Sequence, residues 1–237
     1  MSNGKSKKEE VRTMFNDIAP QYDFLNHFLS FGIDFYWRRR TIRFLKKYKP
    51  ENTLDIATGT GDLAILAAIK NASKKINGID ISTAMLHVGK EKIRKKNLEE
   101  RILLDYGDSE NIPFQDKVFD AAMVAFGVRN FGDLNKGITE IHRVLKPGSP
   151  LLVLEFSQPE NKLFNNLYKF YSFNILPLIG RIISHNKMAY NYLPDSVSKF
   201  PSGKNFERVM LDCGFSKTEI HPFTMGIATL YVGIVAE

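Results

Sequence analysis

The chain has 237 residues, of which 43% are hydrophobic and 25% charged, and its formal net charge is +7 at pH 7. That length allows one substantial hydrophobic core, and a single domain with appended elements is the simplest organisation. The lone cysteine, Cys213, excludes an intrachain disulfide, and no metal site is implied. The positive charge favours contact with an anionic surface, either membrane phospholipid or nucleic acid, without deciding between them.

The first 48 residues predict a tail followed by a helical cap. Residues 1–10 are polar and lysine-rich, so we expect a disordered tail, and no apolar stretch follows that would form a secretory signal. We therefore expect a cytoplasmic protein. Residues 11–48 have a helical pattern interrupted by Pro20 and Gly32, with many aromatic side chains. They predict either a cap over a ligand site or ordinary packing onto the rest of the fold.

A run of basic residues closes this segment. It consists of Arg38, Arg39, Arg40, Arg43, Lys46 and Lys47. Such a run most often forms a solvated helix face, and a membrane-facing role is the second interpretation.

Residues 53–156 alternate between short apolar strands and helices. Strands are expected near residues 53, 76, 102, 118 and 151, and helices near 63, 83 and 134. Alternation of this kind with right-handed crossovers gives a parallel sheet that is covered on both faces. Ligands bind such a sheet beyond the carboxyl ends of its strands, so we expect functional residues along that edge.

A glycine turn follows the first of these strands. Gly59 and Gly61 allow the backbone to approach a ligand closely, and the helix that begins after them presents free N–H groups. Ala64 stands where a dinucleotide-binding fingerprint expects a third glycine, which weakens the case for NAD without excluding it. The turn therefore predicts a nucleotide-type site.

Three acidic residues bear on the choice of cofactor. Asp80 ends the second strand, where its carboxylate can accept hydrogen bonds from both ribose hydroxyls, and it could also cap the helix that starts near Ser82. Asp55 would lie close to the aminoacyl end of S-adenosylmethionine, and Asp108 could accept the adenine amino group. A pyrophosphate would gain nothing from these extra acids, so they favour S-adenosylmethionine over NAD.

Several motifs together resemble one enzyme family. They are the segments 14–23, 37–39, 55–62, 78–80, 107–114, 126–130 and 145–148. Over nearly its whole length the chain is similar to the class I methyltransferases that C-methylate quinone precursors, the ubiquinone/menaquinone biosynthesis methyltransferase family. Many methyltransferases share the segment 55–62, but its combination with 126–130 and the front segment is much more specific. Two positions depart from the family pattern: Ser149 replaces a common glycine, and Ala125 replaces a serine found in some relatives.

The resemblance implies an α/β fold of the class I methyltransferase, Rossmann-like type, with a seven-stranded, mostly parallel sheet and helices on both faces. The last strand is expected to lie antiparallel between the fifth and sixth. Residues 11–237 would form a single methyltransferase domain with an N-terminal helical cap at 11–48 and a lid insertion at 157–202. The implied cofactor is S-adenosyl-L-methionine, and the residues expected to bind it are Asp55, Thr58, Gly59, Thr60, Gly61, Asp80, Ile81, Asp108 and Ser109.

The segment 157–202 interrupts the alternation with a dense series of aromatic and aliphatic residues. Polar and charged residues divide this series, so it is not a membrane span. We expect an apolar lid that buries a polyprenyl tail or makes peripheral contact with the membrane surface, and a homodimer interface or additional core is the alternative. Tyr190, Tyr192, Leu193 and Ser196 continue this lid and are expected to reach the head of the substrate.

The expected reaction is methyl transfer from the sulfonium of S-adenosylmethionine to a ring carbon of a reduced prenylated quinone. The enzyme must align donor and carbon, exclude water and assist proton loss from a quinol hydroxyl. We expect Arg129, Tyr22 and Asp23 to carry this chemistry. Arg129 could stabilise a developing phenolate or orient a water, or it could form a structural salt bridge with Asp133 or Glu140.

Demethylmenaquinol is the expected substrate, and the corresponding benzoquinol of ubiquinone biosynthesis is the alternative. A methyltransferase for another small molecule or for RNA would share the cofactor site. No nucleic acid partner is expected, because the aromatic segment lacks the interleaved cations of a stacking groove. A module that binds the cofactor without turnover is the remaining class, and the intact 55–62 motif argues for binding without proving turnover.

Overall fold

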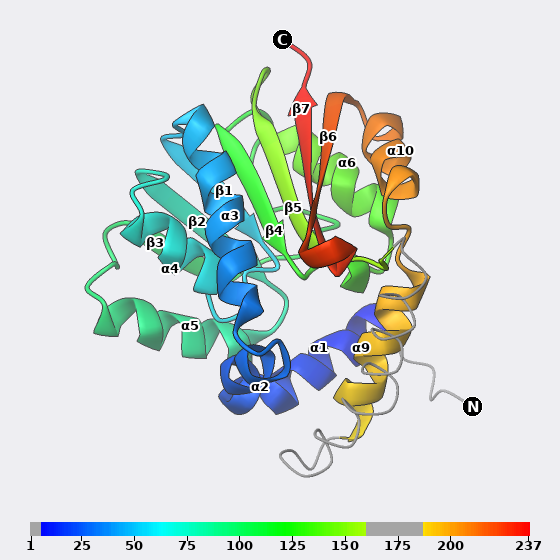
Figure 1. Cartoon of the computed structure of the whole chain (residues 1–237). Helices are drawn as coiled ribbons and strands as arrows, with labels where there is room; N and C mark the ends of the chain where they lie inside the picture. The colour runs from blue at the N-terminus through cyan, green and yellow to red at the C-terminus, as the bar shows by residue number, and fades with distance from the viewer. Residues whose placement is uncertain (1–5, 160–186) are drawn as a thin grey trace.

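The computed structural model describes residues 6–159 and 187–237. A seven-stranded sheet with the strand order β3-β2-β1-β4-β5-β7-β6 forms its centre (Figure 1). The strands are β1 (Asn52–Ile56), β2 (Lys75–Asp80), β3 (Ile102–Tyr106), β4 (Ala121–Ala125), β5 (Pro150–Phe156), β6 (Phe215–Phe223) and β7 (Ala228–Val235). The first five strands pair in parallel, whereas β7 pairs antiparallel with both β5 and β6. The predicted class I methyltransferase sheet is confirmed, including the last strand between the fifth and the sixth.

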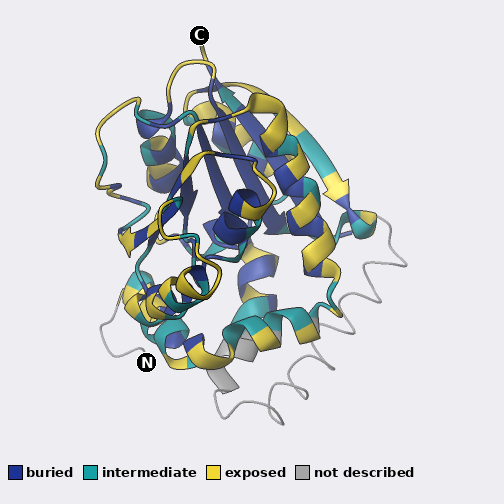
Figure 2. Ribbon diagram, turned by 90° about the vertical axis from the view of Figure 1, so that its left-hand side faces the viewer, coloured by how far each residue is buried: buried dark blue, intermediate teal, exposed yellow. Residues whose placement is uncertain are grey.

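Helices cover both faces of the sheet, and Figure 2 shows the buried strands between them. The helices are α3 (Ile33–Tyr48), α4 (Asp62–Ile69) and α5 (Thr83–Lys95) on one face, and α6 (Leu134–Val144) and α10 (Lys204–Asp212) on the other. Successive residues of a strand point to opposite faces, so each strand feeds two hydrophobic clusters. In β5, Leu152 and Leu154 pack with the first helix layer, and Leu151 and Val153 pack with the second.

The chain changes direction across the sheet at β1, which lies between β2 and β4. β1 is parallel to both neighbours, with Asp55 beside Gly78 of β2 and Met123 of β4. The carboxyl ends of these strands therefore share one edge, where the loops diverge to opposite faces and leave room for a ligand.

Helices from two distant parts of the chain lie across this edge, at the lower side of the sheet in Figure 1. They are α1 (Lys7–Ile18), α2 (Tyr22–Leu29), which is joined to α1 by the short 3-10 helix η1 (Ala19–Gln21), and α9 (Lys187–Lys199). Val11 and Met14 form the buried face of α1. Asn16 anchors this helix to the start of α5, because its Oδ1 accepts a hydrogen bond from Ser82 Oγ at 2.7 Å.

Two expectations for these segments need revision. The predicted tail at residues 1–10 is too long, because α1 begins at Lys7 and Ser6 caps it by accepting the Glu9 N–H on its side chain. Most of the expected lid at 157–202 lies outside the described residues. The parts that can be placed are residues 157–159 and 187–202, which include α9. Within residues 6–159 and 187–237, no helix has both the length and the apolar character to cross a membrane.

Candidate active site

A first pocket lies at the carboxyl edge of the sheet, with the loops after β1, β2, β3 and β4 on one side and α1 on the other. Its volume is about 640 Å³, including the part that is open to solvent. Lys8, Val11 and Phe15 of α1 cover it. The predicted cofactor-binding residues that line it are Gly59, Asp80, Ile81, Asp108 and Ser109.

The turn after β1 brings the backbone to the pocket in unusual conformations. Ala57, Gly59 and Gly61 have left-handed φ values of 52°, 56° and 78°. Glycine adopts this region without a steric penalty, and a β-carbon at Gly59 would have no protein atom within 4 Å, so this position is open to a ligand. Ala57 carries strain on the order of 1–2 kcal/mol, which is common beside ligand sites.

The other predicted cofactor residues do not line the described part of the pocket but hold this turn in place. They are Asp55, Thr58, Thr60 and Gly61. Thr58 Oγ1 donates to Asp55 Oδ2 at 2.6 Å, and the Gly61 N–H donates to the Thr58 carbonyl at 2.9 Å. Thr60 is buried and turns its hydroxyl away toward α2. Asp55 is only 1% exposed, and this burial raises its pKa to about 7.

Asp80 has the position expected of a ribose ligand. Its Oδ2 accepts the Gly59 N–H and its Oδ1 accepts the Ser82 N–H, both at 2.8 Å. Ser82, and not Asp80, caps α5, because Ser82 Oγ accepts the Met85 N–H. Both oxygens of Asp80 keep lone pairs for further donors, and burial raises the pKa of this carboxyl. A carboxylate with spare acceptors beside an open glycine backbone fits the ribose of S-adenosylmethionine.

Lys8 reaches the residue that was predicted to bind adenine. Its Nζ lies 2.7 Å from Asp108 Oδ2 and 3.0 Å from Glu110 Oε2. Asp108 therefore lines the pocket as expected, but it shares its charge with a lysine. No sequence signal identified Lys8, although the one-turn spacing of Val11 and Met14 indicates that this helix has a buried face.

A second pocket adjoins the first. It is lined by α1, α2 and α3, by the loop after β4, by the end of β5 and by α9. Phe15, Tyr22 and Phe126 line both pockets, so three aromatic side chains form the boundary between them. Phe126 has a φ of 60°, which is unusual for a bulky residue, and its N–H donates to the Leu154 carbonyl at 2.7 Å.

Arg129, a predicted catalytic residue, lines this second pocket. Its Nη1 donates to Glu155 Oε1 at 2.8 Å and to the carbonyl of Phe126 at 2.5 Å, and its Nε donates to Ser196 Oγ at 3.3 Å. The guanidinium also stands 5.5 Å from the centroid of the Phe156 ring. Arg129 therefore fixes the strained backbone of Phe126 while it faces the pocket.

The salt-bridge partners considered for Arg129 from the sequence are wrong. Asp133 caps α6 by accepting the Lys136 N–H, and Glu140 pairs with Arg143 at 2.8 Å. The actual partner, Glu155, is fully buried at the end of β5, and burial raises its pKa while Arg129 acts against this rise.

Tyr22 and Asp23 are neighbours in sequence but lie in different surroundings. Tyr22 lines both pockets, and burial raises the pKa of its hydroxyl, so this group keeps its proton near neutral pH. Asp23 accepts hydrogen bonds from Thr60 Oγ1 at 2.5 Å and from Lys92 Nζ at 2.6 Å. In the described part of the chain Asp23 lines neither pocket, so its position does not support the predicted catalytic role.

Three residues of the expected lid lie at or beside the second pocket, namely Tyr192, Leu193 and Ser196. Tyr192 lines the second pocket, and its hydroxyl donates to Asn130 Oδ1 at 3.0 Å. Ser196 accepts the hydrogen bond from Arg129. The side chain of Tyr190 lies outside the described residues.

The arginine run of α3 is only partly solvated. Arg39 is exposed, but Arg38 is buried and lines the second pocket. The prediction of a single solvated face is therefore wrong for Arg38. A helical phase that buries Trp37, Thr41 and Leu45 also turns Arg38 toward the sheet edge.

Comparisons with known proteins agree with this architecture. The model of the ubiE/COQ5 methyltransferase family matches residues 3–235. A demethylmenaquinone methyltransferase of Bacteroides fragilis is 44% identical over 230 residues, which cover 97% of this chain and 94% of that protein. A ubiquinone/menaquinone biosynthesis C-methyltransferase UbiE of Geotalea daltonii is 46% identical over 228 residues, covering 96% of this chain and 97% of that one.

Solved structures with low sequence identity share the fold. The [4+2]-cyclase SpnF superposes with a TM-score of 0.67 at 16% identity, covering 98% of this chain and 97% of that chain. A phosphoethanolamine N-methyltransferase 2 of Haemonchus contortus, solved in complex with S-adenosyl-L-methionine, has a TM-score of 0.66 at 18% identity, covering 94% and 60%. Since the family model spans nearly the whole chain, the protein belongs to the ubiE/COQ5 methyltransferase family and is an S-adenosylmethionine-dependent methyltransferase.

Proposed function

We propose that the enzyme methylates a ring carbon of a reduced prenylated quinone, with demethylmenaquinol as the substrate and menaquinol as the product. The observation that carries this proposal is the shared aromatic boundary of the two pockets at Phe15, Tyr22 and Phe126. The acid-lined first pocket suits the nucleoside of the cofactor, and the second suits a flat aromatic ring. The name of the Bacteroides fragilis relative, demethylmenaquinone methyltransferase, supports the same substrate.

S-adenosylmethionine supplies a methyl group that is activated by its sulfonium. The residues of the chain align the ring with this methyl group, exclude water and manage the charge that develops on a quinol oxygen. Within the described residues Arg129 Nη2 has no hydrogen-bond partner, so it can donate to that oxygen as the oxygen passes its proton to water. After methyl transfer the ring carbon loses its hydrogen as a proton and the oxygen is protonated again. The protonated hydroxyl of Tyr22 is a second donor at the boundary, and the Phe126 and Phe156 rings offer apolar faces to the substrate.

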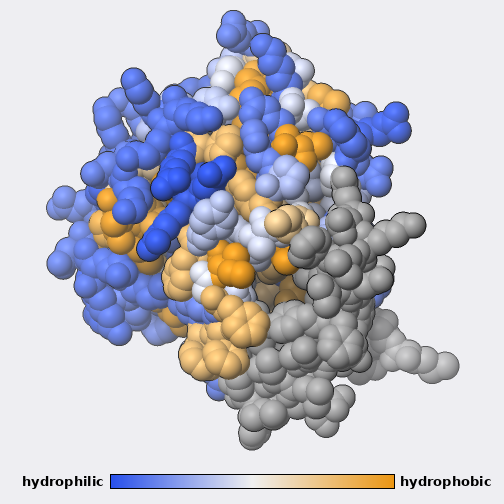
Figure 3. All heavy atoms as spheres, viewed as in Figure 1, coloured by the Kyte–Doolittle hydropathy of each residue, from blue (hydrophilic) through white to orange (hydrophobic). Residues whose placement is uncertain are grey.

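We further propose that the protein is cytoplasmic and makes peripheral contact with the inner face of the membrane, where a prenylated substrate dissolves. Apolar side chains gather at the lower end of the surface in Figure 3. Large exposed apolar residues of α2 and the start of α3 are Phe24, Phe28, Ile33, Phe35 and Tyr36. Aromatic residues next to a basic helix favour the interface of an anionic bilayer. Flotation with anionic vesicles tests this contact, and sedimentation equilibrium tests the homodimer that the sequence left as an alternative role for the apolar segment.

The choice of acceptor is tested with methyl-labelled S-adenosylmethionine and detergent-dispersed quinols. Reduced demethylmenaquinone and a demethylated benzoquinol are offered in separate reactions. We expect label in the naphthoquinol alone. Label in the benzoquinol alone would assign the enzyme to ubiquinone biosynthesis instead, and label in neither, with cofactor binding intact, would refute quinol methylation.

A further inference from the structure

A buried arginine at the boundary of the two pockets lacks a complete set of partners. Arg38 is 8% exposed, and its guanidinium carbon stands 5.4 Å from the centroid of the Phe126 ring. Its Nε lies 3.4 Å from Asp34 Oδ2. Among the described residues, no acceptor is bonded to Nη1 or Nη2. Buried donors of a charged group are costly to leave unpaired, so the Nη atoms require an acceptor that a ligand can supply.

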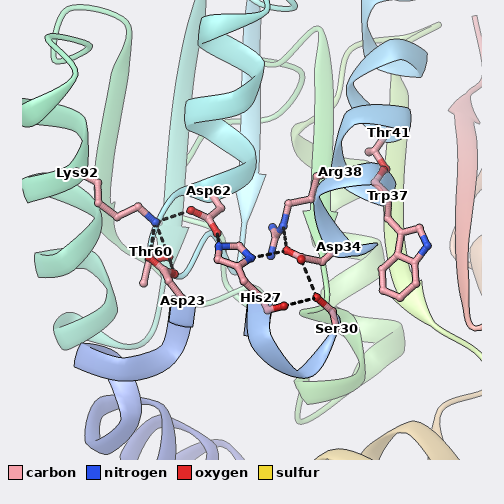
Figure 4. A network of polar contacts seen from close by, with 10 residues as sticks. All are labelled: Asp23, His27, Ser30, Asp34, Trp37, Arg38, Thr41, Thr60, Asp62 and Lys92. Atoms are coloured by element: carbon pink, nitrogen blue, oxygen red, sulfur yellow. Dashed lines mark hydrogen bonds and ion pairs between the residues drawn. The ribbon is translucent and has the colours of Figure 1, made fainter. Parts of the chain in front are cut away.

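A chain of polar contacts holds Arg38 in this orientation, as Figure 4 shows. Asp34 is 3% exposed, and it accepts hydrogen bonds from Ser30 Oγ at 2.7 Å and at its other oxygen from His27 Nδ1 at 2.8 Å. Ser30 and His27 thus fix the carboxylate of Asp34, which in turn holds the Nε side of the Arg38 guanidinium. The two Nη groups at the far side of the fork are therefore left for another acceptor.

The same network continues to the glycine turn. His27 Nε2 lies 3.6 Å from Asp62 Oδ2, and Asp62 forms an ion pair with Lys92. Lys92 in turn contacts Asp23 and Thr60, and Thr60 belongs to the turn after β1. The network thus ties the position of Arg38 to the turn that approaches the cofactor.

The charge of Arg38 acts on groups at the end of β1 and the start of α4. Burial acts to raise the pKa of Asp62, but Arg38 and Lys92 outweigh this effect and lower it. Arg38 also opposes the rise in the pKa of Asp55 that burial causes. The guanidinium is therefore close enough for its charge to act on both carboxyls. Asp62 is the first residue of α4, and the free N–H groups and the dipole at that end of a helix favour an anion.

The geometry of the pockets indicates which anion arrives there. Asp80 and Asp108 face the first pocket, where they suit the ribose and the adenine of S-adenosylmethionine. The remaining part of the cofactor is an aminoacyl group with one carboxylate. It must extend from the ribose past Phe126, which borders both pockets. Arg38 and Arg129 both line the second pocket beside Phe126. Of the two, only Arg38 acts on the pKa values of Asp55 and Asp62, so it is the arginine on the side of the glycine turn.

We propose that the Nη atoms of Arg38 bind the carboxylate of the aminoacyl group of S-adenosylmethionine, and that Asp34 and His27 position the guanidinium for this contact. Through this contact the protein binds adenosyl ligands that carry an amino-acid carboxylate more tightly than adenosyl ligands that lack it. A planar guanidinium suits this task because it binds a carboxylate through two parallel hydrogen bonds. The contact depends on the cofactor alone and not on the identity of the quinol.

The test compares two ligands that differ by one carboxylate. Calorimetry measures the affinity of the protein for S-adenosylhomocysteine and for its decarboxylated analogue, in the wild type, Arg38→Gln and Arg38→Lys. Charge-assisted hydrogen bonds predict that the wild type prefers S-adenosylhomocysteine by about 30-fold. In Arg38→Gln this preference should fall below about 3-fold, with the affinity for the decarboxylated analogue unchanged. Arg38→Lys keeps the charge but not the fork, so we expect an intermediate preference.

Two matched variants control the result. Arg39→Gln removes the neighbouring exposed arginine of the same helix and should keep the wild-type preference. Asp34→Asn/Arg38→Gln removes both charges of the buried pair, which avoids an uncompensated carboxylate if Arg38→Gln alone fails to fold. It should show the same loss of preference.

Other outcomes would overturn the proposal. An equal loss of affinity for both ligands in Arg38→Gln would indicate a general effect on the pocket. An unchanged preference would show that another group binds the carboxylate. Unchanged affinities with methyl transfer abolished would assign Arg38 to the acceptor instead.

Discussion

Arg129 Nη1 lies 2.8 Å from Glu155 Oε1 in the wall of the second pocket, and the two side chains are 6% and 0% exposed. The pair therefore stabilises the fold and also places a hydrogen-bond donor at the second pocket. Arg129 pairs with a buried carboxylate and fixes the carbonyl of Phe126 through Nη1. Its Nη2 has no partner among the described residues, and the side chain lines the pocket proposed for the quinol. A substitution at Arg129 is therefore expected to change both the turnover rate and the free energy of unfolding.

Replacing Arg129 by alanine should reduce kcat by at least about 100-fold, the scale seen when one donor to a developing oxyanion is removed. The dissociation constant of S-adenosylhomocysteine should change by less than about 3-fold, because Arg129 does not line the first pocket within the described residues. Steady-state kinetics and calorimetry on the same preparation check both values.

The alanine variant leaves Glu155 buried without its partner, which would cost about 3–5 kcal/mol of unfolding free energy. Arg129→Met/Glu155→Gln removes both charges and serves as the control for stability. If the double variant is stable and retains wild-type turnover, Arg129 has no role in the chemistry.

Asp80 should carry much of the affinity for the ribose. Asp80→Ala removes an acceptor for the ribose hydroxyls and also the carboxylate that holds the Gly59 N–H, so affinity for S-adenosylhomocysteine should fall about 30-fold or more. Calorimetry measures the change. Asp105→Ala, at an exposed carboxylate of β3, is the matched control and should bind as the wild type does.

Asp55 should make the ligand-free protein less stable as the pH rises. Its carboxyl keeps its proton up to about pH 7 in the folded protein but loses it near pH 4 in the unfolded chain, where the ordinary value is 3.8. Between these values the folded state binds more protons, so the free energy of unfolding decreases with increasing pH, by up to about 4 kcal/mol in total.

Urea unfolding of the wild type and Asp55→Asn at pH 5 and pH 8 checks this dependence. Other buried acids, such as Asp80 and Glu155, titrate in both proteins, so the difference between the two proteins isolates Asp55. The wild type should lose at least about 1 kcal/mol relative to Asp55→Asn between the two pH values. Parallel pH dependences would contradict the raised pKa.

Lys8 should affect the rates at which the cofactor binds and dissociates more than it affects the dissociation constant. The Lys8 side chain is 35% exposed, and partly exposed pairs such as its contact with Asp108 contribute only about 0–1 kcal/mol. Lys8→Gln should therefore change the dissociation constant less than about 5-fold, but it should increase both the association and the dissociation rates of S-adenosylhomocysteine by loosening α1 over the pocket. Stopped-flow fluorescence measures these rates. Lys74→Gln, which removes the exposed ion pair with Glu51, should leave them unchanged.

The sheet and the ligand edge could be predicted from the sequence because they follow from local patterns. The strand-helix alternation of residues 53–156 fixes a parallel sheet, and the carboxyl ends of its strands bring Asp80 and Asp108 to one pocket. The turn after β1 could be predicted for the same reason, because Gly59 and Gly61 adopt left-handed conformations that glycine favours.

Most features of the site that the sequence did not predict depend on contacts between distant elements. The pairing of Arg129 with Glu155 spans 26 residues and two strands, and no local pattern encodes it. The position of α1 over the pocket depends on its contacts with α5 and α9, which lie far away in the sequence. Within the arginine run, helical phase could have separated buried Arg38 from exposed Arg39, because Asp34, Trp37 and Leu45 share its buried face.

We propose delivery of a methyl group from the first pocket, across the aromatic boundary, to a reduced ring in the second. Its most direct test is a single-turnover reaction with methyl-labelled S-adenosylmethionine, offering demethylmenaquinone in its reduced form and, separately, in its oxidised form. Label should enter the reduced form alone and remain on a ring carbon, since only the quinol can release a proton and activate the carbon for attack. Equal labelling of the oxidised form, or label on a quinol oxygen, would rule out methyl transfer to a ring carbon of the quinol.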